Sequence, residues 1–503
     1  MNRTRRTLGI RVLAVLLLTV TSVTFLLTAC KDSQTSQPQN PSGTTGGQGA
    51  TGDPNSMTAQ ITQTYGDYDF NKYEFRILGM ESGSWWYKSF MDESFNEIWY
   101  ETDSAEPLQS SIYTRNRRTE DLLNISIEPV WTAGSEETAQ RVRTAGLTSD
   151  TDYDICLASL YDTLVLAQEG RVVNYYDITT LDLSHSWWDQ KLVESYTIFK
   201  NKLYVLAGAI NVYDDMSVSI MLFNKDLAGA LGLDNPYQMV RDNQWTLDSM
   251  VAMAKAACHD DGNGTSGQED TWGIWYGTSS GGLFAGFDLD ITELDEEGTP
   301  YLAVEREEHV NAALQLYEKV IVGEVFFDGY ASEEDRNEAF ADDRLLFYTI
   351  MTCYLNRFRD MQTDFGILPM PKLNAEQERY GHFVNFHFYS TYFVPVSNTD
   401  LDRTGTIMDV MGGYSVDTVY ETTFGTLMGY DSKLLRDNDS KDMLDIVFNS
   451  KMFDYSVLGL GQIRDIYNMN DWGSFMYESA VDTYKRPANS NLKKIIANFE
   501  ALD

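Results

Sequence analysis

Histidine and cysteine are scarce in this 503-residue chain, and the short motifs of common catalytic sites are missing. The sequence has five histidines and four cysteines, and it contains no HExxH, GxSxG, Walker A or GxGxxG pattern. The cysteines show no CxxC spacing, and only Cys156, Cys258 and Cys353 follow the first thirty residues. An odd number of separated cysteines argues against a disulfide framework and against a zinc site. We therefore expect that this chain is not an enzyme.

Basic residues are also few. The chain has 38 lysines and arginines against 75 acidic residues, which gives a formal charge of −37. A nucleic-acid partner is excluded on this balance, because phosphate backbones are bound by clustered positive charge. The acids are spread along the chain, as expected for a solvated surface. Hydrophobic residues make up 43% and aromatic residues 13%, which is enough for a large core. The chain is also too long for one typical domain.

The N-terminus has the features of an export signal. Four arginines lie among the first eleven residues, and residues 12–27 carry no charge. That run is too short and too rich in Thr and Ser for a comfortable transmembrane helix. Residues 27–30, Leu-Thr-Ala-Cys, resemble a bacterial lipobox, which predicts a removed signal at 1–29 and a lipidated Cys30. Removing the four arginines takes the formal charge from −37 to −41. The alternative is a plain secretory signal with an incidental cysteine.

Residues 30–66 lack almost everything that a core needs. They are nearly all Ser, Thr, Gln, Gly, Asn, Pro and Asp, and the first aromatic residue is Tyr65. Such a segment stays a flexible tether, because it cannot bury enough apolar surface to fold. As a coil it spans about 35 Å. We expect a folded body held near the outer face of the bacterial cytoplasmic membrane.

The first part of the body alternates strands with helices. Strands are expected at 73–79, 125–130 and 153–158, and helices at 112–123 and 136–147. This alternation predicts a mostly parallel sheet in an α/β fold. Ligands of open α/β sheets lie beyond the carboxyl ends of the strands. The turn at 81–87, which carries Trp85 and Trp86, follows the first strand at such a position.

The later sequence predicts further helices and strands, and we find no internal repeat. Thr246 is a good N-cap for a helix at 247–257. The other expected elements are helices at 310–322 and 441–449, strands at 344–350 and 365–368, and a strand-rich segment at 383–396.

Residues 202–225 are the stretch around which the rest is organised. An apolar run at 203–206 and another at 218–223 flank Gly208 and a polar group of Asn211, Tyr213, Asp214 and Asp215. Two buried strands around a polar cluster fit a chain that crosses between two lobes and lines their cleft. The alternative is an ordinary pair of core strands joined by a polar turn.

Several stretches in this order resemble those of bacterial extracellular solute-binding proteins of family 1. These are the sugar-binding components of ABC importers, with the fold of the maltose-binding protein. The stretches are 112–125, Trp-Trp-Asp-Gln at 187–190, Lys-Leu-Tyr at 202–204, the segment 217–225 that ends in Phe-Asn-Lys, 231–237 and Trp-Thr-Leu-Asp at 245–248. The resemblance covers nearly everything after Cys30.

The resemblance implies a type II periplasmic-binding-protein-like fold with a ligand cleft between two α/β lobes. The first lobe would comprise 67–213 and 390–435, and the second 214–389 and 436–503. The implied protein is a monomer that captures a mono- or oligosaccharide and delivers it to ABC permease subunits. The alternatives are a sensory or adhesion lipoprotein that reuses the fold, and an importer receptor for peptides or another polar nutrient.

Sugar binding needs flat apolar faces and polar groups that pair with hydroxyls. The aromatic candidates near expected cleft edges are Trp85, Trp86, Trp187, Trp188, Tyr213, Trp275, Tyr276 and Trp472. Each also fits ordinary packing, and Trp187 and Trp188 are the weaker candidates. At least one of Asp214 and Asp215 is expected to face the cleft, and a hinge hydrogen bond is the alternative. As a glycosidase pair these two fail, because neighbours on a strand point to opposite sides.

The loop at 259–270 resembles a calcium loop. Asp261, Asn263 and Asp270 take positions three, five and twelve of the pattern D-x-[DN]-x-[DN]-G. Position one is His259, a poor calcium ligand, and position twelve is Asp instead of Glu. A structural calcium ion is one hypothesis, and a rigid turn without metal is the other; no other cofactor is expected.

Overall fold

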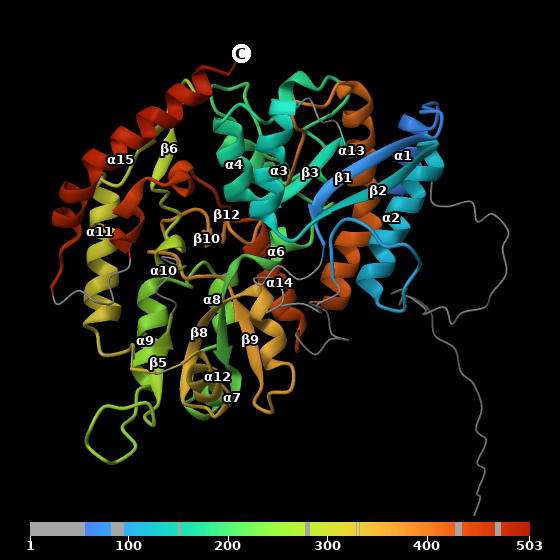
Figure 1. Ribbon diagram of the computed structural model, residues 1–503. Helices are drawn as coiled ribbons and strands as arrows, with labels where there is room; N and C mark the ends of the chain where they lie inside the picture. The colour runs from blue at the N-terminus through green and yellow to red at the C-terminus, as the bar shows by residue number, and fades with distance from the viewer. Residues whose placement is uncertain are drawn as a thin grey trace, which may run out of the picture. The chain divides into compact units, whose positions relative to one another are not determined.

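The computed structural model describes residues 56–81, 95–148, 152–276, 282–327, 329–330, 332–427, 435–467 and 474–502. Cys30, Trp85, Trp86 and Trp472 lie outside the described residues, so what was predicted for them stays a prediction. The described part of 52–503 is a mixed α/β fold with two four-stranded sheets (Figure 1). Within those ranges, no helix combines the length and the apolar character that a bilayer crossing needs.

The first sheet has the strand order β11-β3-β1-β2. Its strands are β1 (Tyr73–Met80), β2 (Ile125–Thr132), β3 (Ile155–Ser159) and β11 (Ser390–Phe393). β1 is parallel to both β2 and β3, and helices α2 (Pro107–Leu123) and α3 (Ser135–Thr148) make the crossovers that parallel neighbours require. β11 runs antiparallel to β3. The predicted strands and helices of this region are confirmed, apart from shifts at their ends.

The second sheet has the order β5-β8-β4-β9. Its strands are β4 (Ser219–Asn224), β5 (Trp272–Trp275), β8 (Leu345–Met351) and β9 (Phe365–Leu368). β5 is parallel to β8, whereas β4 is antiparallel to both β8 and β9. All six residues of β4 are buried, because both faces of the sheet are covered. The mostly parallel arrangement that was predicted from residues 73–158 holds for the first sheet and does not extend to this one, where β4 runs antiparallel to both of its neighbours.

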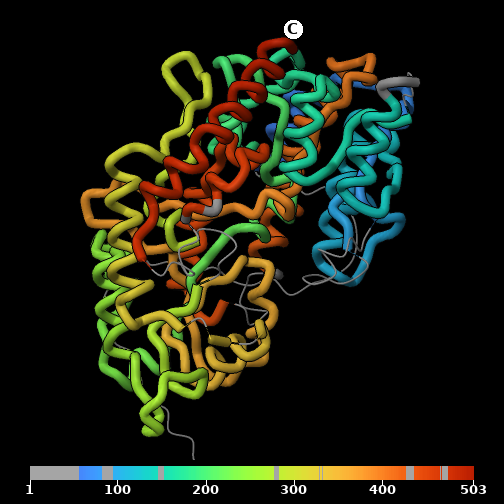
Figure 2. Tube along the Cα trace, turned by 60° about the vertical axis from the view of Figure 1, so that its left-hand side comes forward, coloured from blue at the N-terminus to red at the C-terminus, as the bar shows by residue number. Residues whose placement is uncertain are grey.

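Two short sheets and thirteen further α-helices make up most of the rest of the described part. The short strands are β6 (Thr292–Leu294), β7 (Pro300–Leu302), β10 (His382–Phe383) and β12 (Lys451–Met452). The helices are α1 (Met57–Tyr65), α4 (Leu160–Gln168), α5 (Gln190–Tyr196), α6 (Tyr213–Met216), α7 (Lys225–Ala230), α8 (Pro236–Arg241), α9 (Leu247–Ala257), α10 (Gly282–Ala285), α11 (Glu307–Leu316), α12 (Glu333–Ala341), α13 (Leu401–Ser415), α14 (Asn438–Phe448) and α15 (Tyr477–Glu500). α13 packs on α1 and α2, and α15 lies beside α11 in both Figure 1 and Figure 2.

The helix start predicted at Thr246 is confirmed. The Thr246 hydroxyl accepts a hydrogen bond from the Ser249 backbone N–H, and the Ser249 hydroxyl accepts one from the Thr246 N–H. This capping box satisfies two N–H groups that the first turn of α9 would otherwise leave without partners. The predicted helix at 310–322 begins earlier, as α11, and continues from Tyr317 to Ile321 in π-helical form.

The stretch 202–225 differs from its prediction in two places. Residues 203–206 form no regular strand and contribute a single bridge, between Leu206 and Tyr392. Gly208 has a φ of +151°, and a Cβ atom there would lie 2.1 Å from the Trp187 carbonyl oxygen, so the close approach requires glycine. The polar cluster then forms the short helix α6 instead of an open turn.

Helix α6 is held from outside by Glu97. One Glu97 carboxylate oxygen accepts hydrogen bonds from the N–H groups of Val212 (2.6 Å) and Tyr213 (3.0 Å) and from the Ser390 hydroxyl (3.0 Å). Beside it, the buried Arg115 guanidinium donates to the carbonyl oxygens of Ile210 and Ile98. These bonds explain why the chain turns into a helix at this point, because they satisfy its first N–H groups.

Candidate functional site

A cavity of about 670 Å³ opens at the end of the second sheet where β5 and β8 terminate. Trp275 ends β5 and Met351 ends β8, while Ser219 begins the antiparallel β4, so these three residues lie at the same end of the sheet. The cavity is closed by α10, α12, the segment 383–387, the segment 452–457 and Arg464. Its volume is typical of a small-molecule site, and its position beyond the ends of β5 and β8 is the usual one for α/β folds.

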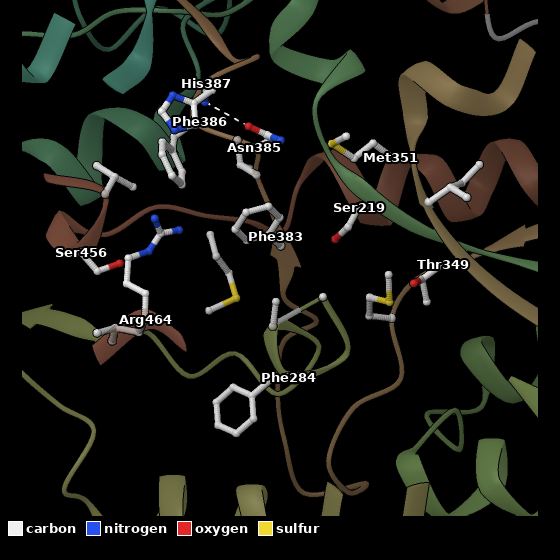
Figure 3. Close-up of a pocket in the computed structure, with 18 of the residues that line it drawn as sticks. Ser219, Phe284, Thr349, Met351, Phe383, Asn385, Phe386, His387, Ser456 and Arg464 are labelled. Atoms are coloured by element: carbon white, nitrogen blue, oxygen red, sulfur yellow. Dashed lines mark hydrogen bonds between the residues drawn. The ribbon is translucent and has the colours of Figure 1, made fainter. Parts of the chain in front are cut away.

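The lining combines flat rings with polar groups, several of which are shown in Figure 3. The rings are those of Trp275, Phe284, Tyr348, Tyr354, Phe383 and Phe386, and the uncharged polar groups are those of Ser219, Thr349, Asn385, His387 and Ser456. The charged residues are Asp290, Glu333, Arg336, Asp454 and Arg464. This combination suits a polyol, because ring faces pack against C–H groups and polar side chains pair with hydroxyls.

Trp275 is the predicted aromatic platform that the described structure places at the cavity. Its ring is half-buried, with the edge of Tyr348 at a centroid distance of 5.4 Å and the Arg336 guanidinium 4.3 Å from the ring centroid. Burial raises the pKa of Tyr348 to about 12, so its hydroxyl stays protonated and donates to Asn337. Trp275 is thus held between two fixed neighbours, which sets the orientation of its ring.

The remaining described aromatic candidates lie in packed surroundings. Tyr276 is buried against Phe326, and Tyr213 is buried against Phe95, and neither lines the cavity. The neighbouring candidates Trp187 and Trp188 are also buried. The indole N–H of Trp187 donates to Asp409, which fixes it in the core near α13. Among the described candidates, the structure therefore brings one, Trp275, to the cavity.

Asp214 and Asp215 belong to a buried cluster around Lys451, here called the Lys451 cluster. The Lys451 ammonium lies 2.7 Å from Asp189, 3.0 Å from Asp215 and 4.0 Å from Asp214. The Tyr389 hydroxyl donates to Asp189 at 3.0 Å. The prediction that Asp214 and Asp215 point to opposite sides of a strand is wrong, since both lie on helix α6 and face one lysine.

Burial dominates the protonation of the Lys451 cluster. It raises the pKa of Asp214 well above its usual range, and the neighbouring Asp215 adds to that rise. The pKa of Asp215 is raised less, because Lys451 opposes the effect of burial. The negative charges in turn hold the pKa of Lys451 well above its usual range, despite burial. Neither Asp214 nor Asp215 lines this cavity. The cluster joins α5, α6 and β12, and Lys451 also borders a second, smaller cavity of about 400 Å³.

The predicted calcium loop closes on itself. The Asp270 carboxylate accepts the N–H groups of Asp261 (2.9 Å) and Gly267 (2.8 Å). Asp261 accepts from both the backbone and the side-chain amide of Asn263. The carboxylates of Asp260, Asp261 and Asp270 are close enough to share an ion. These bonds fit the rigid-turn alternative, and the calcium ion stays a prediction.

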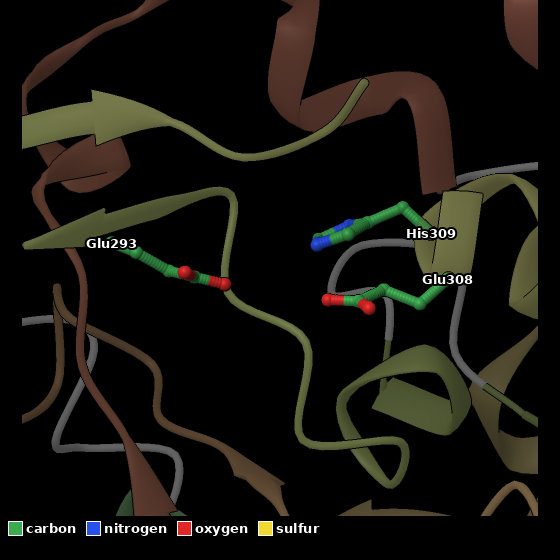
Figure 4. A group of neighbouring side chains, drawn as sticks. All are labelled: Glu293, Glu308 and His309. Carbon is green, nitrogen blue, oxygen red and sulfur yellow. The ribbon is translucent and has the colours of Figure 1, made fainter. Parts of the chain in front are cut away.

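A second acidic group is held by an arginine. Figure 4 shows Glu293 pointing toward Glu308 and His309, at the start of α11. Arg306 forms ion pairs with both Glu293 and Glu308. Burial, aided by Arg306, lowers the pKa of His309 to about 4, so its ring is neutral at physiological pH. Arg306 already supplies the positive charge that a metal ion would bring, so an ion-pair network accounts for this group.

Sequence reasoning missed most of the cavity lining. Arg336 lies on α12, whose first turn is acidic and whose exposed face resembles any solvated helix. Asn385 and His387 fall in the segment expected to be strand-rich, and Arg464 lies near the C-terminus. These residues meet only through the packing of distant segments, so no local pattern marked them.

The sequence matches no protein-family model and no curated protein, whereas solved structures match it. An extracellular solute-binding protein from Staphylococcus aureus in complex with maltose is 11% identical, with a TM-score of 0.56 over 84% of this chain and 98% of that chain. A cyclo/maltodextrin-binding protein complexed with maltotetraose is 11% identical, with a TM-score of 0.55 over 84% and 97%. A galacto-N-biose-/lacto-N-biose I-binding protein of an ABC transporter from Bifidobacterium longum is 10% identical, with a TM-score of 0.52 over 84% and 98%.

Similarity at such low identity establishes the fold and nothing finer. It confirms the predicted fold class, the α/β fold of type II periplasmic-binding proteins. The predicted lobe boundaries stay a prediction.

Proposed function

We propose that this chain is a solute-binding receptor that captures a carbohydrate and delivers it to the permease of an ABC importer. The observation that carries the proposal is the cavity at the ends of β5 and β8, where aromatic rings lie beside hydroxyl, amide and charged groups. The solved structures of the same fold support it, because their names describe binding of maltose, maltotetraose and lacto-N-biose.

The proposed role is binding without chemical change. Asp290 and Asp454 both border the cavity, as a catalytic acid pair would. However, one Asp454 oxygen accepts the N–H of Ile291 (3.0 Å) and the other accepts the N–H of Ser456 (2.6 Å), which makes it the cap of a helical turn. Chromatography of a bound saccharide after prolonged incubation should return it intact, and a cleaved product would contradict the proposal.

We propose that a lipid on Cys30 holds the body at the outer face of the cytoplasmic membrane. The support is the sequence alone, in which small residues precede Cys30 after an uncharged run. In cells, Cys30→Ser should release the body into the medium or leave an unprocessed precursor. A Cys30→Ser protein of mature size that remains in the membrane fraction would show that the anchor is elsewhere.

A thermal-shift screen of residues 52–503 against saccharides, peptides and amino acids tests the ligand class. A ligand at a hundred times its dissociation constant stabilises the folded state by about 2.7 kcal/mol, which raises Tm measurably. A shift with at least one saccharide supports the proposal, and shifts confined to peptides or amino acids would overturn it. Uptake of that saccharide should then fail in a deletion strain; normal uptake with lost transcriptional response would favour the sensory alternative.

A further inference from the structure

The cavity carries positive charge in a strongly acidic protein. The whole chain has 38 basic and 75 acidic residues, yet two arginines, Arg336 and Arg464, line the cavity. Each guanidinium lies over an aromatic ring that also lines it, Arg336 over Trp275 and Arg464 over Phe386, both at 4.3 Å from the ring centroid. Figure 3 shows Arg464 reaching up to Phe386 at one side of the cavity. Two arginines fixed on rings are a specific arrangement against such a charge background.

Arg336 has charge that the surrounding protein does not neutralise. Within the described residues, no carboxylate lies within 4.0 Å of its guanidinium; the guanidinium hydrogen-bonds the neutral hydroxyl of Tyr348, and its buried Nε atom has no hydrogen-bond partner. Arg357 shows the contrast: it also lies over a ring, that of Tyr354, but its charge is paired with Glu333. A buried guanidinium nitrogen without a partner is costly, so the surrounding protein leaves part of the hydrogen-bonding capacity of Arg336 unused.

The acidic residues of the lining are already engaged. Glu333 pairs with Arg357, and both oxygens of Asp454 accept backbone N–H groups. Burial and the nearby Asp454 raise the pKa of Asp290 well above its usual range, which disfavours a negative charge on this carboxyl. Burial also lowers the pKa of His387, which keeps its ring neutral. The charge that a ligand meets near Trp275 is therefore that of Arg336.

We infer that the cavity binds a saccharide that carries a carboxylate, with Arg336 as the residue that recognises it. The inference rests on the proposed function and names the class of saccharide. The Arg336 guanidinium lies 4.3 Å from the Trp275 ring centroid and lines the cavity, and the terminal N–H groups of a guanidinium match the two oxygens of a carboxylate. A hydroxyl in the same place accepts one weaker bond. Trp275 then contributes to sugar binding in two ways: its ring packs against Arg336, and its ring also contacts the sugar.

Calorimetric titration of residues 52–503 with matched sugar pairs tests this inference. The pairs are galacturonate with galactose, glucuronate with glucose, and the corresponding oligosaccharides. The acidic member of at least one pair should bind at least 10-fold more tightly, and higher salt should weaken that binding, because charge attraction is screened. Arg336→Gln should weaken acidic binding by about 10- to 100-fold, as expected for loss of a charged hydrogen-bond pair. Arg336→Lys should retain part of the affinity.

Arg241→Gln provides the matched control. Arg241 lies on α8, pairs with Asp439 and Asp442 and does not line the cavity, so its loss changes the net charge equally without touching the site. Both variants should melt near the wild-type temperature.

The outcomes separate this inference from the proposed function. A neutral sugar that binds as tightly as its acidic partner would overturn the carboxylate assignment and leave the receptor proposal standing. Binding of a sulfated or phosphorylated sugar without any uronate binding would also overturn it. Unchanged acidic binding in Arg336→Gln would remove Arg336 from the assignment. If no saccharide of any kind binds, the proposed function itself fails.

Discussion

Replacing Lys451 by methionine is a stringent test of the buried charge cluster. Lys451 is 5% exposed and, among the described residues, is the cation that lies within 4.0 Å of Asp189, Asp214 and Asp215. Methionine keeps the length of the side chain and removes the charge, so carboxylates that were paired become buried without a counter-ion. Breaking a buried pair in this way typically costs about 3–5 kcal/mol of unfolding free energy. We expect a loss of that size near neutral pH.

The loss should depend on pH. In the folded state the pKa of Asp214 and that of Asp215 are raised by burial, whereas an unfolded Asp titrates near about 3.9. The folded state then binds more protons than the unfolded state. The stability that the two carboxyl groups contribute is therefore fully present below the unfolded pKa and is lost as pH rises through the folded pKa. Lys451 opposes the rise for both residues. Without it the folded pKa values rise further, and the deficit of Lys451→Met should be smaller at about pH 5 than at about pH 8.

Urea unfolding of residues 52–503 at the two pH values measures this effect through the midpoint and slope. Lys485→Met is the control, because Lys485 forms exposed pairs with Glu305 and Asp482, and its midpoint should stay close to the wild type. The double variant Lys451→Met with Asp215→Asn should recover part of the loss. Wild-type stability of Lys451→Met at neutral pH, or a deficit that grows on acidification, would refute the reasoning.

Three smaller changes test the local structure around Gly208, α6 and α9. Gly208→Ala should prevent folding or lower Tm strongly, because its Cβ would lie 2.1 Å from the Trp187 carbonyl oxygen; a wild-type melting curve would contradict this. Glu97→Ala should cost about 2–5 kcal/mol in urea unfolding, since it leaves two buried N–H groups at the start of α6 without partners; a loss under about 1 kcal/mol would show that α6 does not depend on it. Thr246→Ala should lower stability by about 1 kcal/mol, with Thr246→Ser close to wild type, and equal losses in both would argue against the capping box.

Local pattern was enough to predict the elements whose signals are local. The strand at 365–368 has the predicted bounds, and Thr246 caps α9 as expected, because alternation, burial and capping depend on neighbouring residues. The α/β class followed from the order of such elements, and the type II periplasmic-binding-protein-like fold was what the family resemblance implied. Where a distant side chain decides the backbone, prediction failed: Glu97 lies 115 residues from Val212 and makes a helix of what looked like an open turn.

The cavity could not be predicted for the same reason. Trp275 was one of eight aromatic candidates expected at the cleft edges. Arg336 was not a candidate, since an arginine on a helix with an acidic first turn is ordinary in a solvated surface, and only the packing of α12 beside β8 places it over Trp275. His387 and Arg464 reach the lining from segments far apart in the chain. Residues that meet through tertiary packing leave no mark on the local sequence.

The most direct measurement compares two tryptophans on strand β5. In calorimetric titration with the saccharide identified by thermal shift, Trp275→Ala should have a dissociation constant at least 10-fold larger than that of the wild type, because Trp275 lines the cavity. Trp272→Ala is the matched control: Trp272 stacks on Phe327 at 4.9 Å, outside the lining, and its loss should leave affinity unchanged. Equal affinities for wild type, Trp275→Ala and Trp272→Ala would show that the saccharide binds elsewhere and would contradict the assignment of this cavity.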